Sequence, residues 1–139
     1  MNNQEKIIKN YPLTNKVECD YDCYLVDKKR YIVFWEGLVE KKSIGNILDQ
    51  LKEKTNTTNF TEWKTLIVIG NTRDVYKKEE LFYFDNVSTF IIFYLINEES
   101  NIVYMNDSWI FALGCNYKKH VRRINKFMSV ENVKMVVTK

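Results

Sequence analysis

The sequence predicts an α+β domain in which a mainly antiparallel sheet carries two or three helices on one side. Runs of alternating apolar and polar residues, separated by polar turns, indicate strands. Two segments with apolar residues at helical spacing indicate amphipathic helices. The chain has 139 residues, of which 45% are hydrophobic, with a single proline, so little of it suits a linker. We therefore expect one domain over residues 1–139, with residues 1–15 as a candidate flexible N-terminal segment.

The first predicted elements form a hairpin. Residues 17–26 alternate, with Val17, Cys23 and Leu25 on one face, which is typical of a half-buried strand. A polar turn at 27–30 follows, and residues 31–35 are β-branched and aromatic, as in a second strand. The short turn between them predicts antiparallel pairing.

A helix and a buried strand come next. Ile44, Ile47, Leu48 and Leu51 recur at i, i+3, i+4 and i+7, and this predicts a helix whose apolar face packs on the sheet. Residues 66–69 are a continuous apolar run, which indicates a strand buried on both faces. The segment that follows, 70–73, could bring its backbone close to a ligand. It has neither a Walker lysine pattern nor GxGxxG, so it gives little support to nucleotide binding.

The second half of the chain repeats this order of elements. Residues 72–86 fit either a short helix or an added strand, and both readings stay open. Strands are predicted at 88–96 and 102–105, a second amphipathic helix at 117–128 and a last strand at 132–138. An offset of 70 residues aligns the two halves without a gap. The sequence thus suggests a ββαβ pseudo-repeat, and the alternative is a chance likeness of two aromatic hairpins.

The termini and apolar runs carry no sign of a membrane or export signal. Residues 1–16 are polar and contain no apolar core like that of a signal peptide. The longest apolar run, 90–96, is far shorter than the roughly 20 residues that span a bilayer. These observations predict a cytoplasmic protein without a membrane partner.

Cysteine and histidine are too few for the common structural sites. An odd count of cysteines, Cys19, Cys23 and Cys115, argues against a disulfide framework. His120 is the only histidine, so a zinc site with four cysteine or histidine ligands is not expected. We expect no metal and no cofactor, and we interpret the cysteines as small buried residues.

Positive charge is concentrated in the predicted C-terminal helix. Residues 110–139 carry a net charge of +6, whereas residues 1–109 carry −3, giving +3 for the whole chain. Five cations lie opposite the apolar stripe of this helix: Lys118, Lys119, Arg122, Arg123 and Lys126. Such asymmetry points to an acidic protein surface or to nucleic-acid phosphates. The plain alternative is a solvated helix face.

A carboxylate cluster offers a weaker alternative. Asp20 and Asp22 share one predicted strand face, and Glu62 and Lys64 form an E-x-K at the start of a buried strand. Carboxylates with a lysine can hold Mg²⁺ and activate water, as metal-dependent nucleases do. The fragment resembles the PD-(D/E)xK nuclease pattern, but the Pro-Asp element of that pattern is absent.

Taken together, these features favour a small non-enzymatic protein-binding module. Asn, Lys, Ile, Tyr and Phe are abundant and Ala112 is the single alanine, which indicates an AT-rich source such as a microbial or mobile element. An immunity protein or inhibitor from a mobile element or a microbial conflict (defence) system would fit. The alternatives are a nucleic-acid-binding protein that uses the basic helix and, less favoured, a Mg²⁺-dependent nuclease.

Overall fold

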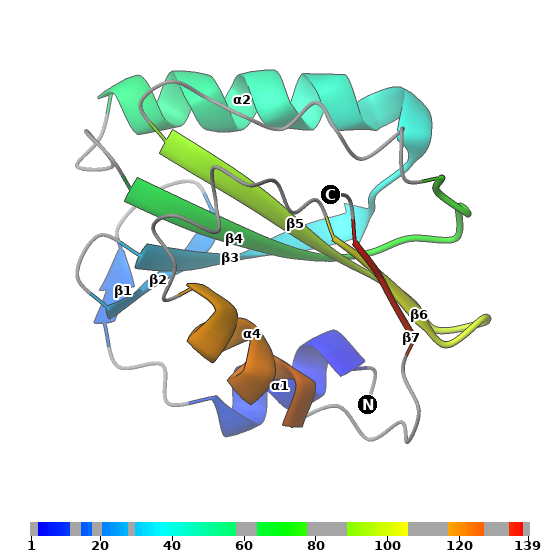
Figure 1. Ribbon diagram of the computed structural model, residues 1–139. Coiled ribbons are helices and arrows are strands. Elements are labelled where there is room, and N and C mark those ends of the chain that lie inside the picture. Colours follow the sequence, from blue (N-terminus) through cyan, green and yellow to red (C-terminus); the bar gives the residue numbers. More distant parts are fainter. Residues whose placement is uncertain are drawn as a thin grey trace.

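A mixed sheet with helices on both faces makes up the protein in a computed structural model (Figure 1). The structure describes residues 3–11, 15–17, 21–27, 30–57, 64–77, 89–105, 117–126 and 134–137. Seven strands in these ranges pair in sequence order. They are β1 (Asn15–Val17), β2 (Asp22–Asp27), β3 (Arg30–Leu38), β4 (Lys64–Asn71), β5 (Thr89–Asn97), β6 (Ile102–Met105) and β7 (Lys134–Val137). The helices in the described ranges are α1 (Asn3–Asn10), the 3₁₀ turn η1 (Lys41–Ser43), α2 (Ile44–Thr57) and α4 (Tyr117–Lys126).

The centre of the sheet is parallel. β3 pairs with β4 and β4 with β5 in parallel, as do β6 and β7, while β1–β2, β2–β3 and β5–β6 are antiparallel. The α+β class is confirmed, but the sheet is mixed, because helix α2 carries the chain back to start β4 beside β3 in the same direction. The alternation over 17–26, read as one strand, falls on two paired strands, β1 and β2.

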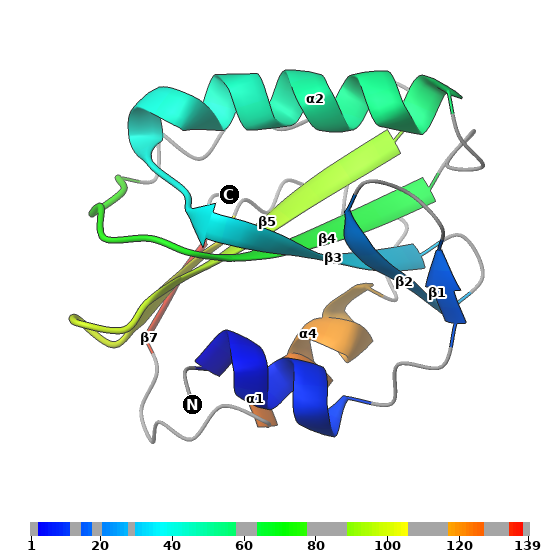
Figure 2. The same cartoon turned by 180° about the vertical axis from the view of Figure 1, so that it is seen from behind.

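The sheet is covered on both faces, so the expectation of helices on one side is wrong. α2 lies on one face, whereas α1 and α4 lie side by side on the other (Figures 1 and 2). The strand at 66–69 shows why, since Leu66 and Val68 pack toward α2 while Ile67 and Ile69 pack toward α1 and α4. The prediction that this strand is buried on both faces is therefore confirmed, and each face needs its own helical cover.

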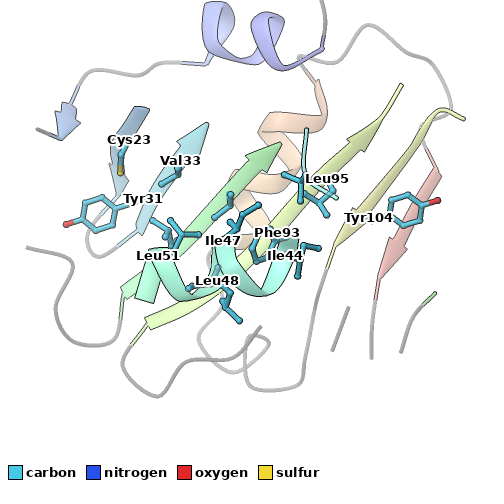
Figure 3. Packing of buried hydrophobic residues seen from close by; sticks show 14 of the residues in the cluster. Cys23, Tyr31, Val33, Ile44, Ile47, Leu48, Leu51, Phe93, Leu95 and Tyr104 are labelled. Carbon is cyan, nitrogen blue, oxygen red and sulfur yellow. The ribbon is translucent and has the colours of Figure 1, made fainter. Parts of the chain in front are cut away.

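The predicted apolar stripe of α2 forms the centre of one core. Its buried side chains Ile44, Ile47, Leu48 and Leu51 meet Phe93 and other residues of the sheet (Figure 3). On the opposite face, the second core contains Ile7 of α1, Tyr11 directly after α1 and Ile124 of α4. Within residues 1–15, the structure describes α1, and Ile7 of this helix is fully buried in the second core.

The two ββαβ units share their connectivity. β2–β3–α2–β4 and β5–β6–α4–β7 each contain an antiparallel pair, a helix and a strand parallel to the one before the helix. The registers differ, because Phe34 pairs with Asp22, whereas Tyr104, its partner at the 70-residue offset, pairs with Leu95 rather than Ile92. The repeat therefore holds for the topology and fails for residue-by-residue strand pairing.

Two glycines shape the sheet near the carboxyl ends of the parallel strands. β3 bulges between Phe34 and Leu38, and Gly37 within this bulge has a φ of +85°, which residues with a side chain rarely adopt. At Gly70 in β4, a Cβ atom would lie 2.9 Å from Cγ2 of Val39. The chain directly after β3 therefore stays beside β4, with the Val39 side chain packed against Gly70.

Within the described residues, no helix has the length and apolar character needed to cross a bilayer. Residues 72–77 form a loop without helix or strand, and the remainder of the ambiguous 72–86 segment lies outside the described residues.

Candidate functional site

A cleft of about 310 Å³ opens where the three central parallel strands end. Leu38 closes β3, Asn71 closes β4 and Ile96 precedes the last residue of β5, so one edge of the sheet supplies the floor. The loop after β4 and the β5–β6 turn supply the walls with Thr72, Arg73, Glu98 and Glu99. In sheets with parallel strands, ligands bind outside the carboxyl ends of the strands. This cleft is the first candidate site.

Thr72 anchors the loop that follows β4. It is 3% exposed, and its backbone N–H donates to the Ile96 carbonyl at 2.9 Å, which continues the pairing between β4 and β5. Its hydroxyl accepts from the Asp74 N–H at 3.1 Å and lies 3.3 Å from the Tyr76 hydroxyl. Because these groups are buried or partly buried, their loss would leave unsatisfied polar atoms, and this holds the loop in one conformation.

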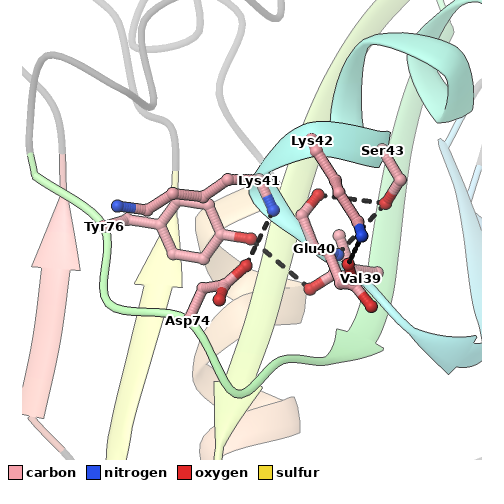
Figure 4. A network of polar contacts seen from close by, with 7 residues as sticks. All are labelled: Val39, Glu40, Lys41, Lys42, Ser43, Asp74 and Tyr76. Atoms are coloured by element: carbon pink, nitrogen blue, oxygen red, sulfur yellow. Dashed lines mark hydrogen bonds and ion pairs between the residues drawn. The ribbon is translucent and has the colours of Figure 1, made fainter.

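Asp74 joins this loop to the start of α2 (Figure 4). Its carboxylate accepts a 2.8 Å hydrogen bond from the backbone N–H of Lys41 in η1. The Lys41 ammonium lies 5.5 Å from the centre of the Tyr76 ring, and the Tyr76 hydroxyl donates to the Val39 carbonyl at 3.5 Å. Two segments that are distant in sequence, 39–41 and 74–76, are thereby fixed to each other.

The β5–β6 turn is held by a buried amide. Asn97 is 3% exposed, and its side-chain nitrogen donates to the Asp74 carbonyl at 3.2 Å. Its side-chain oxygen accepts from the Ser100 N–H at 3.1 Å, which closes the turn that carries Glu98 and Glu99. Asn101 ends the turn with a φ of +64°. One side chain thus sets the position of the carboxylate wall relative to the loop with Arg73.

The second candidate site is the helical layer formed by α1 and α4. The predicted basic residues Lys118, Lys119, Arg122, Arg123 and Lys126 all belong to α4. Arg122 and Lys126 are exposed, and Arg123 is half-buried. Ile124 is fully buried, and the Tyr94 hydroxyl donates to the side-chain oxygen of Asn125, so α4 is fixed on the sheet.

Arg123 connects α4 to the N-terminal helix. Its guanidinium carbon lies 5.0 Å from the centre of the Tyr11 ring, directly after α1, which is a cation–π contact. α1 adds Lys6 and Lys9 to the same layer and one acid, Glu5. The layer therefore carries a net charge of +6 on its helices, whereas α2 on the other face has two acids and two bases.

The proposed nuclease residues are not brought together where the structure describes them. Asp22 in β2 is opposite Phe34, which is opposite Ile69 in β4, five residues beyond Lys64. At about 3.3 Å per residue, Asp22 and Lys64 are separated by roughly 16 Å along the strands alone. Asp20 and Glu62 lie outside the described residues.

Asp22 has structural partners of its own. Its carboxylate lies 3.9 Å from the Lys16 ammonium. The pKa of Tyr24 is raised above its ordinary value, first because burial disfavours the charged phenolate. The hydrogen bond and the negative charge of Asp22 raise it further.

Of the three cysteines, the structure describes Cys23, whose side chain is buried in the core on the α2 face. Cys19 and Cys115 lie outside the described residues. No group of three or more His, Cys, Asp or Glu side chains suited to a metal ion occurs in the described part of the chain.

Sequence reasoning identified the basic helix but missed most of the cleft. The 70–73 segment was singled out for its place after a buried strand, and Asn71, Thr72 and Arg73 do line the cleft. Glu98 and Glu99 fall between the strands predicted at 88–96 and 102–105, a position that by itself indicates only a turn. Their signal was present, since a turn that follows a strand parallel to β4 must lie at the same edge of the sheet.

Comparisons with protein-family models, with curated proteins and with solved structures find no match for this chain. The function proposed below therefore rests on the residues and their geometry.

Proposed function

We propose that this chain is a non-enzymatic protein-binding module that recognises an acidic partner through the α1–α4 layer. The observation that carries the proposal is the contact of Arg123 with Tyr11, which joins two helices from opposite ends of the chain into one basic surface. A guanidinium held over a ring is restricted before binding, so less conformational entropy is lost when it pairs with a carboxylate.

The layer also exposes apolar surface. Ile8 on α1 is 37% exposed although its neighbour Ile7 is fully buried. Protein interfaces combine apolar anchors with arginine and a polar rim, whereas contacts to a phosphate backbone are made mainly by charge and hydrogen bonds. An exposed isoleucine among basic residues therefore supports a protein as the partner. An inhibitor or immunity protein from a mobile element or defence system is the form of such a module that the AT-rich composition supports.

Charge reversal tests the proposal directly. The variant Arg122→Glu with Lys126→Glu changes two exposed residues of α4, and the control, Asn46→Glu with Gln50→Glu, introduces two glutamates at exposed residues of α2 on the other face of the sheet. Each tagged protein is used for affinity capture from a nuclease-treated extract of its source cells. We expect one protein to be retained by the wild type and by the control, and its affinity for purified α4 variant to fall at least tenfold, about 1.4 kcal/mol.

The nucleic-acid alternative has its own signature. Arg122 and Lys126 are both exposed and spaced at i and i+4, so they lie on one side of α4, which could follow a phosphate backbone. Binding of a 20-base-pair duplex near 50 mM salt, with steep loss at higher salt and in the α4 variant, would replace the protein-partner proposal. Capture of the same protein by the α4 variant and the wild type would contradict any role for this layer.

A further inference from the structure

The cleft at the carboxyl ends of β3, β4 and β5 combines opposite charges on opposing elements. Arg73 lies on the loop after β4, and Glu98 and Glu99 lie on the β5–β6 turn, and all three are exposed. In the part of the chain that the structure describes, no ion pair joins Arg73 to Glu99. Leu38, which is 44% exposed, supplies apolar surface to the same cleft, while Ile96, which is 1% exposed, forms part of its floor.

This set of groups restricts the charge of a ligand. A phosphate or a dicarboxylate would meet two glutamates, and a simple cation would meet the arginine guanidinium, so each would be attracted by one wall and repelled by the other. A molecule with one carboxylate and one ammonium meets a favourable partner on both sides. Arginine is the side chain best suited to a carboxylate, because its planar fork can donate two parallel hydrogen bonds.

The dimensions and rigidity of the cleft fit a small molecule. Its volume of about 310 Å³ is at the lower end of the range for ligand pockets, roughly 300–1,000 Å³. The two charged walls are fixed to each other, since buried Asn97 hydrogen-bonds to the Asp74 carbonyl on one wall and to the Ser100 N–H on the other. The cost of ordering the walls on binding is therefore small.

We propose that the cleft binds a small zwitterionic molecule of the amino-acid class. Its carboxylate is paired by Arg73, its ammonium by Glu99, and its apolar side chain contacts Leu38. This site lies at the carboxyl ends of the central parallel strands and uses none of the residues of the α1–α4 layer, so it stands independently of the protein-binding proposal.

Three probes with the same branched apolar body test the charge requirement. L-Leucine carries both charges, 4-methylpentanoate lacks the ammonium and isoamylamine lacks the carboxylate. Binding to the full chain is followed by amide chemical shifts in NMR titrations at millimolar concentrations. We expect leucine to shift the resonances of Asn71–Arg73 and Glu98–Glu99, with each singly charged probe at least tenfold weaker.

Variants assign the effect to the cleft. Arg73→Gln and Glu99→Gln each remove one charge from an exposed side chain, and we expect each to weaken leucine at least tenfold. Asp49→Asn, an exposed change on α2, is the matched control and should leave leucine binding unchanged. Arg73→Glu should turn the preference toward isoamylamine, a gain that misfolding cannot imitate.

Three outcomes would overturn the proposal. One is the absence of leucine binding at millimolar concentration, and another is equal binding of leucine and either singly charged probe. The third is tighter binding of inorganic phosphate than of leucine, which would make the cleft an anion site.

Discussion

Gly70 is the position at which the packing behind the cleft can be tested most sharply. A methyl group added there lies 2.9 Å from Cγ2 of Val39, closer than real Cβ contacts come, and Val39 is fully buried and β-branched, so it cannot turn away. Overpacking of this kind costs about 1–3 kcal/mol, and about 0.5–1 kcal/mol is regained because alanine loses less backbone entropy than glycine in a strand. We therefore expect Gly70→Ala to lower the free energy of unfolding by about 1 kcal/mol.

A double-mutant cycle separates this contact from other effects. Val39→Ala alone removes two buried methyl groups and should cost about 1–3 kcal/mol. In the double variant, the new methyl at position 70 occupies part of the space vacated at position 39. The double variant should then be more stable than the sum of the single changes predicts, by about 1–2 kcal/mol.

Urea unfolding followed by circular dichroism measures all four proteins, with an unchanged denaturant slope as the check that the unfolding transition is the same. Additivity within about 0.5 kcal/mol, or a stabilising Gly70→Ala, would refute the close approach of Val39 to β4. Either result would also be inconsistent with the 2.7 Å hydrogen bond from the Val39 N–H to the Asn71 carbonyl, which lies at the edge of the cleft.

Three further predictions concern the helical layer and the cleft. Ile124→Ala should cost about 2–5 kcal/mol in thermal or urea unfolding because Ile124 is fully buried under α4, whereas Ile8→Ala should change stability by less than about 1 kcal/mol; equal losses would contradict the placement of α4. Burial raises the pKa of Tyr94 above its ordinary value of 10.0, so above that pH the unfolded chain releases this proton while the folded chain keeps it. Stability should therefore fall as the pH rises past 10.0, and less steeply in Tyr94→Phe; identical slopes in wild type and variant would refute the burial of this hydroxyl. Asn97→Ala should cost about 1–3 kcal/mol and speed hydrogen exchange at the Ser100 amide, and an unchanged exchange rate would mean that Asn97 does not hold the turn.

The local spacing of apolar residues was sufficient to find the helices and strands. It did not predict the relative direction of neighbouring strands or the face of the sheet on which each helix packs. The spacing of Ile44, Ile47, Leu48 and Leu51 identified α2 and its buried face, and all four are buried. Nothing in the spacing says on which face of the sheet a helix lies. The signal that could have corrected the one-sided arrangement was the continuous apolar run at 66–69, since a strand buried on both faces needs cover on both.

The two candidate sites also differ in how much of each could be predicted from the sequence. The charge segregation of α4 is a property of one helix, so it could be read from the sequence, with Arg122 and Lys126 found exposed. The contact of Arg123 with Tyr11 spans more than a hundred residues, and only the assembled sheet brings α1 beside α4. The cleft likewise depends on the parallel register of β4 and β5, which places the Arg73 loop beside the Glu98–Glu99 turn.

The topology explains why the basic helix lies opposite α2. Crossover connections between parallel strands of one sheet are almost always right-handed. β3 and β4 run in one direction and β6 and β7 in the other, because the β5–β6 hairpin reverses the chain, while strand order advances the same way across the sheet. If both crossovers are right-handed and the second pair of strands runs in the opposite direction, the second crossover helix, α4, must lie on the other face of the sheet. α4 is thereby placed beside α1, and the separation of the basic layer from α2 follows from the strand order before any charge is considered.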